Sequence, residues 1–446
     1  MNDREFDVIL WGATGFTGRL VAAHLLARYG AGSGGLRWAI GGRSEQKLDE
    51  VRAGLGEAAA GLPLVIADAG DQALLDVLAS RTRVVCSTVG PYARYGSGLV
   101  AACAHHGTHY CDLTGEVHWM RRMIDTHHER ARETGARIVH TCGFDSIPSD
   151  LGTLFVQREM QRAHGAPATI VKFRAREMRG GFSGGTVASM LEMFEEADRD
   201  PAVRAVLADP YGLNPQGQRQ GLDGPERTLP SFDADLGAWV TPFVMAAINT
   251  RVVRRSNALL GYAWGHDFRY DEGMVMPFGP WGFPLAAGVS AGSAAVSTAA
   301  SFGAVRRLLT PLLPRPGQGP SEQARRNGLF VIDMVAKSAA DGPVALQATV
   351  RGEGDPGYAS TSRMLGEAAV CLAVDELDSP GGRKRRGEPD VQAEPGNVQG
   401  RSVQEKGWGR ARSSILSRLR VEPLIHRLNE AEGPALDFEA TPSAGD

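Results

Sequence analysis

The sequence predicts an α/β protein. Its amino-terminal part should form a Rossmann-type, doubly wound parallel sheet, and a second domain of mixed α+β structure should follow. Two observations support this prediction. Up to about residue 150, short apolar runs alternate with helical patterns, as is typical of a parallel sheet covered by helices on both faces. Beyond that point strands, helices and a long loop follow one another without this alternation.

The first part contains six strand-like runs. The first, DVILWG, leads through a glycine loop into a helix whose buried side carries Val21, Leu25 and Leu26. The later runs are LRWAIGGRS, LPLVIADAGD, RVVCSTVGPY, THYCDLTGE and ARIVHTCGFDSIPSD. The helical patterns between them are EQKLDEVRAGLG, DQALLDVLAS, SGLVAACAHHG and a polar helix over 118–134. Six strand–helix units in this order predict a doubly wound sheet.

The second part mixes strand and helix patterns. ATIVKFRARE predicts a strand, and the pair LFVIDMVAKSA and VALQATVRG, separated by a turn at 341–343, predicts an antiparallel hairpin. The predicted helices are SGGTVASMLEMFEEADRD, FVMAAINTRVVRRSNALLG and TSRMLGEAAVCLAVDEL. The stretch 209–236 is rich in Gly, Pro and Gln and predicts a long loop.

These patterns divide the chain into four segments. The predicted segments are a dinucleotide-binding domain over 1–148, a substrate and dimerisation domain over 149–350, a helix returning to the first domain over 351–378 and a divergent tail over 379–446. The tail begins with residues of low hydrophobicity, so we expect part of it to be disordered.

The loop GATGFTG, between the first strand and the first helix, predicts a dinucleotide site. Its glycines would let the chain leave the strand sharply, approach a pyrophosphate and pack the helix on the strand, and the helix N-terminus would add positive potential. A purely structural turn is the alternative. The residues assigned to the cofactor are Gly12, Thr14, Gly15, Phe16, Gly18, Arg43, Ser44, Asp68, Gly90, Pro91 and Tyr92.

The end of the second strand indicates which dinucleotide binds. NAD sites usually place an acidic residue here to hold the ribose hydroxyls. This chain has Gly41-Gly42-Arg43-Ser44 instead, with Lys47 one turn further on. A guanidinium and a hydroxyl suit the 2′-phosphate of NADP(H), so we predict NADP(H) rather than NAD(H). A solvated arginine at the start of the next helix is the alternative interpretation.

Composition excludes several classes of function. A net charge of −3 gives no reason to expect a nucleic-acid partner. The five cysteines form no C-x-x-C pair, and the clustered histidines fall at helix ends and polar faces, so we predict no metal site. The sequence shows no leader of the signal-peptide type, which favours a cytoplasmic location.

One uncharged stretch runs from residue 273 to residue 305. It is long enough to span a bilayer, but Ala, Ser and Gly dominate it, so transfer into lipid would gain little. We expect a buried pair of small-residue helices. Membrane insertion and a peripheral membrane contact through 276–305 are the alternatives.

The positions of the lysines exclude a common reductase mechanism. Short-chain dehydrogenases, whose glycine spacing is similar, need a Tyr-x-x-x-Lys pair for proton transfer. The lysines of this chain are Lys47, Lys172, Lys337, Lys384 and Lys406. None of them follows a tyrosine by four residues.

Five linked motifs resemble the saccharopine dehydrogenase-like oxidoreductases, and within them the bacterial group of trans-acting enoyl reductases. The motifs are GATGFTGRL, GGRS, STVGPYARYG, YCDLTGE and CGFDSIPSDLG. Similarity continues through SGGTVASM, PGQGPS and DPGYASTSRMLGEAAVCLA. Residues 381–419 depart from the family pattern, which puts the closure of the second domain in doubt.

The resemblance implies an NAD(P)-dependent reductase with a substrate cleft formed by the second domain. Residues 90–92 would border the nicotinamide, and 145–148 would face its reactive end, although Asp-Ser-x-Pro is also ordinary turn chemistry. Residues 183–186 would cap a helix aimed at the cleft, or form a plain N-cap. The residues assigned to the cleft are Asp112, Glu116, Asp145, Ser183 and Thr186.

Three functions remain open at this point. The first is reduction of the C=C bond of an enoyl thioester or related lipid-like acyl group, presented by a synthase, with Tyr92, Tyr95 and Ser146 as candidate catalytic hydroxyls. The second is a saccharopine-type reduction of an imine, for which the arginines of KFRAREMRGG would bind carboxylates. The third is a non-catalytic, NADP-binding protein associated with lipid. A homodimer is compatible with each.

Overall fold

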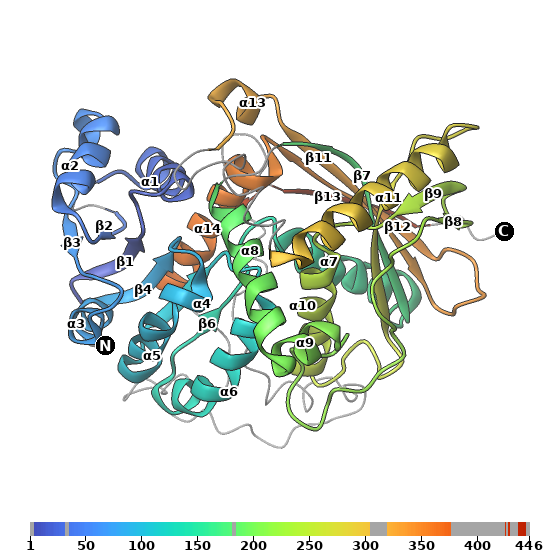
Figure 1. Ribbon diagram of the computed structural model, residues 1–446, viewed down its shortest axis with the longest axis horizontal. Coiled ribbons are helices and arrows are strands. Elements are labelled where there is room, and N and C mark those ends of the chain that lie inside the picture. Colours follow the sequence, from blue (N-terminus) through green and yellow to red (C-terminus); the bar gives the residue numbers. More distant parts are fainter. Residues whose placement is uncertain are drawn as a thin grey trace, which may run out of the picture.

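The computed structural model describes residues 4–31, 35–180, 184–303, 319–375, 424, 427–428 and 436–442. Two sheets lie next to each other, the first towards the left of Figure 1 and the second towards the right. The chain passes from the first to the second sheet through a long helix, α7 (Ile147–His164).

The first sheet has six parallel strands in the order β3-β2-β1-β4-β5-β6. This order confirms the predicted doubly wound sheet. The strands are β1 (Phe6–Trp11), β2 (Trp38–Gly42), β3 (Leu64–Ile66), β4 (Thr82–Ser87), β5 (His109–Asp112) and β6 (Ile138–Val139). The helices are α1 (Phe16–Tyr29), α2 (Glu45–Gly54), α3 (Gln72–Arg81), α4 (Tyr92–Tyr95), α5 (Ser97–His106) and α6 (Val117–Thr134), with a 3₁₀ turn at Glu57–Ala59. Every residue of β1 is buried, as expected for the central strand of a covered parallel sheet.

The second sheet has seven strands in the order β13-β12-β11-β7-β10-β9-β8. It is mixed, because β10 pairs with β7 in parallel while the other pairs are antiparallel. The strands are β7 (Ile170–Arg179), β8 (Ser231–Asp233), β9 (Ala238–Thr241), β10 (Arg269–Val275), β11 (Leu329–Lys337), β12 (Leu346–Glu353) and β13 (Asp437–Pro442). The remaining helices are α8 (Gly184–Arg199), α9 (Pro201–Ala208), α10 (Ala246–Leu259), α11 (Gly282–Ser301), α13 (Glu322–Arg326), the π-helix η3 (Pro356–Ser360) and α14 (Thr361–Val374).

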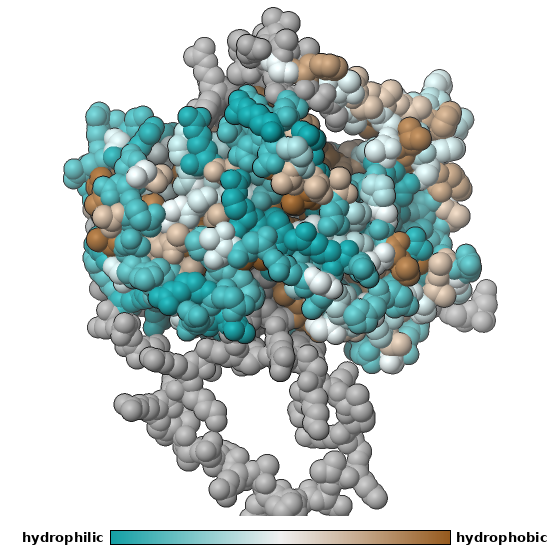
Figure 2. Space-filling model, turned by 60° about the horizontal axis from the view of Figure 1, so that its bottom comes forward, coloured by the Kyte–Doolittle hydropathy of each residue, from teal (hydrophilic) through white to brown (hydrophobic). Residues whose placement is uncertain are grey.

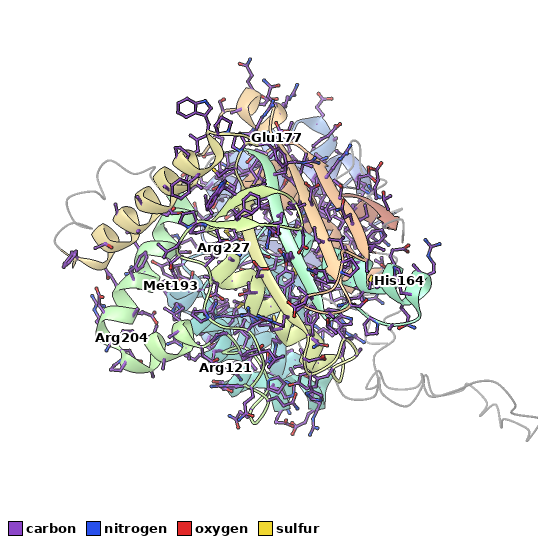
Figure 3. The ribbon with its side chains drawn as sticks, turned by 90° about the vertical axis from the view of Figure 1, so that its right-hand side faces the viewer. Arg121, His164, Glu177, Met193, Arg204 and Arg227 are labelled. Atoms are coloured by element: carbon purple, nitrogen blue, oxygen red, sulfur yellow. The ribbon has the colours of Figure 1, made fainter. Side chains whose placement is uncertain are left out.

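The predicted hairpin is present, and its inner face is apolar. Phe330, Ile332 and Met334 alternate with less buried residues along β11, and Leu346 and Ala348 do the same on β12. Helices α7 and α10 pack on the inner face of the sheet. The outer face carries charged side chains, and Figure 3 looks onto it, with Arg227 and Glu177 labelled.

One expectation about the second part needs correction. The uncharged stretch does not form a buried helix pair, because its described part contains one long helix, α11, with much of its surface exposed. None of the described helices is long and apolar enough to cross a membrane. In the tail, β13 closes the edge of the second sheet beside β12. Most of the tail, 376–423, lies outside the described residues.

Helix α14 packs on the first sheet, although it follows the second sheet in the chain. It contacts β1, β4, β5 and helix α1. Its fully buried Glu367 accepts hydrogen bonds from His24 Nε2 at 2.8 Å and from the Tyr29 hydroxyl at 2.6 Å, and it lies 3.4 Å from Arg28 Nε. This carboxylate therefore ties the first and last helices of the described core together. The segment bounds at 148, 350 and 378 stay predictions.

We predict that Glu367→Ala lowers the free energy of unfolding by about 3 kcal/mol, because it leaves His24, Arg28 and Tyr29 without their buried acceptor. Chemical denaturation of the purified protein measures this difference. Glu133→Ala, at an exposed ion pair on α6, is the matched control and should change stability by less than about 1 kcal/mol. Equal effects of the two substitutions would contradict the proposed role of Glu367.

Candidate functional site

The glycine loop after β1 has the backbone that the sequence predicts. Gly12 has φ of +91°, a value that side chains disfavour, and a Cβ there would lie 2.6 Å from Val89 Cγ2. A Cβ on Gly18 would lie 2.2 Å from the Gly12 carbonyl oxygen. These two glycines therefore allow the sharp turn and the close packing of α1 on it.

The N-terminus of α1 is left without a side-chain cap. Gly15 is the N-cap residue, and the first turn contains no acidic side chain. The first N–H groups of a helix need an acceptor and attract anions, so this end suits a pyrophosphate. Phe16 begins the helix, and its ring lies edge-on to Tyr358 at 5.1 Å with the Arg325 guanidinium 5.4 Å away. Phe16 thus joins the loop to η3 and α13.

The end of β2 presents cations. Arg43 and Lys47 are exposed, and neither forms an ion pair within the described part of the chain. The Ser44 hydroxyl caps α2 by accepting a hydrogen bond from Lys47 N at 3.4 Å. Asp68, at the end of β3, is exposed and accepts from Gly70 N at 2.8 Å. Unpaired cations at this position fit a 2′-phosphate.

The loop after β4 approaches the glycine loop. Thr88 donates a hydrogen bond to the Gly12 carbonyl at 3.1 Å. Tyr92 is buried, and its hydroxyl donates to the Ser87 carbonyl at 3.1 Å and accepts from Leu113 N at 3.3 Å. Burial, with the nearby Asp112 carboxylate, raises the pKa of Tyr92 well above its usual value. These bonds suit a structural role, whereas Tyr95 is 39% exposed with Arg94 beside its ring.

Asp112 is fully buried at the end of β5, and its bonds all run to neighbouring loops. One carboxylate oxygen accepts from Thr114 N at 3.1 Å and Thr141 N at 3.2 Å. The other lies 2.8 Å from His140 Nδ1, and the backbone carbonyl accepts from Cys142 N at 2.7 Å. Asp112 therefore holds the ends of β5 and β6 together.

The side chain of Glu116 holds the loop after β4 in place. Its buried carboxylate accepts from Tyr92 N at 2.8 Å and Ala93 N at 2.7 Å. Desolvation by burial raises its pKa, and the two backbone donors oppose that shift. Two of the three acids that the resemblance places in the cleft, Asp112 and Glu116, thus contact the backbone behind the carboxyl edge of the sheet.

The turn before α7 carries a different kind of carboxyl group. Asp145 is half-buried, and in the described residues no hydrogen bond from another residue reaches its carboxylate. Burial, with a contribution from the Asp112 charge, raises the pKa of Asp145 to about 7. Its neighbour Ser146 is fully buried and donates to Asn249 Oδ1 at 2.9 Å. On the other side, Phe144 N donates to Thr361 Oγ1 at 2.9 Å, so elements of both sheets fix this turn.

Helix α8 lies close to the loop after β4. Ser189 Oγ would be 3.3 Å from a Cβ on Gly90. Ser183 lies outside the described residues, and so does the side chain of Thr186, which is part of α8. Their predicted place beside the substrate stays a prediction. The described residues contain no group of three or more His, Cys, Asp or Glu side chains that could hold a metal ion.

Comparison with known proteins agrees with this arrangement. The family described as the saccharopine dehydrogenase NADP binding domain matches residues 8–139. A trans-acting enoyl reductase of Mycobacterium bovis is 40% identical over 391 residues, which cover 84% of this chain and 90% of the relative. A relative in Mycobacterium tuberculosis, assigned by name to the same group, is 44% identical over 386 residues, covering 83% of this chain and 90% of the relative. The chain belongs to the saccharopine dehydrogenase-like family, in the group of the trans-acting enoyl reductases.

A solved saccharopine dehydrogenase (L-Glu forming) from Saccharomyces cerevisiae also aligns with 97% of this chain and 99% of its own, with a TM-score of 0.47 and 12% identity.

Membership of this family makes NADP(H) the cofactor, and the residues fit it. The tight glycine loop, the uncapped N-terminus of α1 and the exposed Arg43 would hold the pyrophosphate and the 2′-phosphate. The roles of the individual predicted residues stay predictions.

Sequence reasoning missed three residues of this saccharopine dehydrogenase-like site. His140 pairs with Asp112, Thr361 holds the Phe144 backbone and Asn249 links Ser146 to Glu272. Each acts through a partner far away in the chain. The HTCGFD motif was a usable signal for His140, because a histidine at the end of β6 must lie beside the residue that ends β5.

We predict that Arg43→Ala weakens NADPH binding by about 10- to 100-fold and leaves NADH binding unchanged, because only NADPH carries the 2′-phosphate. Titration of both reduced cofactors by fluorescence measures this. Arg132→Ala, at an exposed ion pair on α6, is the control and should bind NADPH like the unaltered chain. Tighter binding of NADH than NADPH by the unaltered chain would contradict the assignment.

Proposed function

We propose that this protein is an NADPH-dependent enoyl reductase that acts on an α,β-unsaturated acyl thioester of a lipid or polyketide, presented by a separate synthase. The observation that carries the proposal is similarity over most of the chain to trans-acting enoyl reductases. The name of these relatives implies an acyl group held by another protein. The site at the carboxyl edge of the first sheet supports reduction with a nicotinamide.

Reduction of an enoyl thioester makes two demands on the protein. NADPH supplies a hydride to the β-carbon when it is bound. Negative charge then develops on the thioester oxygen, and the α-carbon must receive a proton. The protein therefore has to position the acyl group and provide a proton donor near the nicotinamide.

Asp145 is the proton donor that the site supports best. Its pKa of about 7 leaves the carboxyl group protonated in a large share of molecules at neutral pH. It is half-buried, lies at the junction of the two sheets and has no competing partner among the described residues. Of the predicted hydroxyls, Tyr92 and Ser146 are buried and bonded, so Tyr95 is the one that remains accessible.

The saccharopine-type alternative needs cations for several substrate carboxylates. The arginines on β7 that were candidates for this are already paired. Arg174 is buried between Asp233 at 2.8 Å and Asp271 at 3.1 Å. Arg176 pairs with Asp333 at 3.2 Å, and Arg179 with Glu177 at 2.6 Å. This pairing favours an acyl substrate over a poly-carboxylate one.

Three further expectations remain proposals. We expect the protein to work in the cytoplasm, where NADPH and acyl synthases are present. The peripheral membrane contact through 276–305 and the homodimer are the other two. The non-catalytic, NADP-binding alternative is separated from the reductase by the assay that follows.

We predict NADPH oxidation with a panel of enoyl thioesters and none with mixtures of lysine and a keto acid. Loss of the nicotinamide absorbance follows both reactions, and the saturated thioester is identified by mass spectrometry. Turnover in the amino-acid mixtures alone would favour the saccharopine-type reaction. Tight NADPH binding without turnover in either set would favour the non-catalytic alternative.

We predict that Asp145→Asn lowers kcat by roughly 10²- to 10⁴-fold, because the amide cannot supply the proton. In the unaltered enzyme kcat/KM should be level below pH 7 and fall about tenfold per pH unit above it, since the donor is active only when protonated. Asp145→Asn should lose this pH dependence.

The amide variant should keep its fold. A raised carboxyl pKa means that ionised Asp145 destabilises the native state above pH 7, so the neutral amide should not lower the melting temperature there. Asp341→Asn, at the exposed hairpin turn, is the control and should keep both kcat and the pH profile. An Asp145→Asn enzyme with unchanged kcat would exclude this carboxyl group as the donor.

A further inference from the structure

The segment that precedes β11 in the chain packs against the start of α1 in the first sheet. Its helix α13 lies at the top of Figure 1, with α1 to its left and β11 to its right. Gly319 lies so close to the Phe16 ring that a Cβ there would be 2.4 Å from Phe16 Cε1. The Arg325 guanidinium lies 5.4 Å from the centre of the same ring. Because Phe16 is the first residue of α1, Arg325 lies beside the helix whose N-terminus suits the pyrophosphate of the cofactor.

Hydrogen bonds hold Arg325 in this place. Its backbone carbonyl accepts from Asp355 N at 2.8 Å, and its Nη1 donates to the Pro320 carbonyl at 2.7 Å. Asp355 in turn caps η3, because its carboxylate accepts from Tyr358 N at 3.1 Å and Ala359 N at 3.0 Å. The position of the guanidinium therefore follows from backbone contacts and does not require an ion pair.

The charge of Arg325 has no partner in close contact. Among the residues that the structure describes, no carboxylate pairs with Arg325, and its Nε and Nη2 atoms donate no hydrogen bond. Burial raises the pKa of Asp355, and the Arg325 charge opposes that shift only from a distance. The next residue, Arg326, pairs with Glu322 at 2.6 Å. Two adjacent arginines of one short helix thus differ, and the one beside α1 is free.

Arginines on another exposed helix of this molecule are paired. Helix α6 lies at the bottom of Figure 1, the side that comes forward in Figure 2, where hydrophilic residues dominate the surface. All four of its arginines pair with acids, namely Arg121 with Asp125, Arg122 with Glu196, Arg130 with Glu133 and Arg132 with Glu129. A half-buried guanidinium with free donors beside a helix N-terminus suits an anion from outside the chain.

We propose that Arg325 binds the pyrophosphate of NADP(H), together with the first N–H groups of α1. The N-terminus of a helix supplies only about half an elementary charge, which is too little to balance a pyrophosphate. The glycine loop, residues 12–18, contains no Lys or Arg that could supply the rest. A guanidinium presents a planar set of donors that fits phosphate oxygens. A segment next to the second sheet would then complete the cofactor site of the first sheet, whatever the acyl substrate.

Two phosphate contacts are thereby assigned to different arginines. Arg43, at the end of β2, would hold the 2′-phosphate that only NADP(H) carries. Arg325, at the start of α1, would hold the pyrophosphate that NADPH and NADH share. Ligands that carry one of these groups and lack the other therefore separate the two contacts.

Isothermal titration calorimetry of the full chain with three ligands tests the proposal. Arg325→Met keeps an unbranched stem over the Phe16 ring and removes the charge. We expect it to raise the dissociation constants of NADPH and NADH by a similar factor, about 10- to 100-fold. Adenosine 2′-monophosphate, which lacks the pyrophosphate, should bind as it does to the unaltered chain. Arg43→Ala should give the complementary pattern, with NADPH and adenosine 2′-monophosphate weakened and NADH unchanged.

Matched variants separate a pyrophosphate contact from a structural role. Arg326→Met removes the same charge one residue further along α13 and should leave all three affinities unchanged. Arg325→Lys keeps a positive charge and should bind both dinucleotides more tightly than Arg325→Met. Unchanged dinucleotide affinity in Arg325→Met would overturn the proposal. So would an equal loss of adenosine 2′-monophosphate binding, which would indicate a general disturbance of the site, or an Arg325→Lys chain that binds as weakly as Arg325→Met.

Discussion

The buried carboxylate of Asp112 fixes the place where the two sheets meet. Removing a carboxylate from water costs several kcal/mol unless donors replace the lost hydration. Here Thr114 N, Thr141 N and His140 Nδ1 surround it. Thr141 has φ of +62°, a strained value that persists only where neighbouring contacts hold it. The turn that carries Asp145 begins directly after this segment, so its position follows from the bonds of Asp112.

Glu116 and Glu367 are two more buried carboxylates that hold separate segments in place. Glu116 holds the start of α4 beside the glycine loop, and Glu367 holds α14 against α1. Each carboxylate joins segments that are distant in sequence. The architecture therefore uses buried acids as fixed points behind the carboxyl edge, whereas no hydrogen bond from another described residue reaches the Asp145 carboxylate. Under the proposed function, structural and chemical roles belong to different acids.

The sequence was sufficient to predict the strand order and the glycine loop, because both depend on local patterns. Apolar runs alternate with helices, and Gly12 and Gly18 occupy positions where a Cβ would collide. The sequence was insufficient to predict which acid is buried and which is accessible. The exposure of Asp112 and Asp145 depends on packing between the sheets. Composition also misled the interpretation of α11, because an uncharged helix of small residues can lie at the surface as well as in a core.

Helix α8 connects the loop after β4 with helix α11. Ser189, near its N-terminus, reaches Gly90 of the loop after β4, and the helix also packs on α11. Further along, Glu196 pairs with Arg122 of α6 at 3.1 Å and lies 3.2 Å from His118 Nε2. A helix with contacts to α6, α11 and the loop after β4 has little freedom to move. Under the proposed function, α8 therefore forms a fixed wall of the acyl site beside the loop after β4.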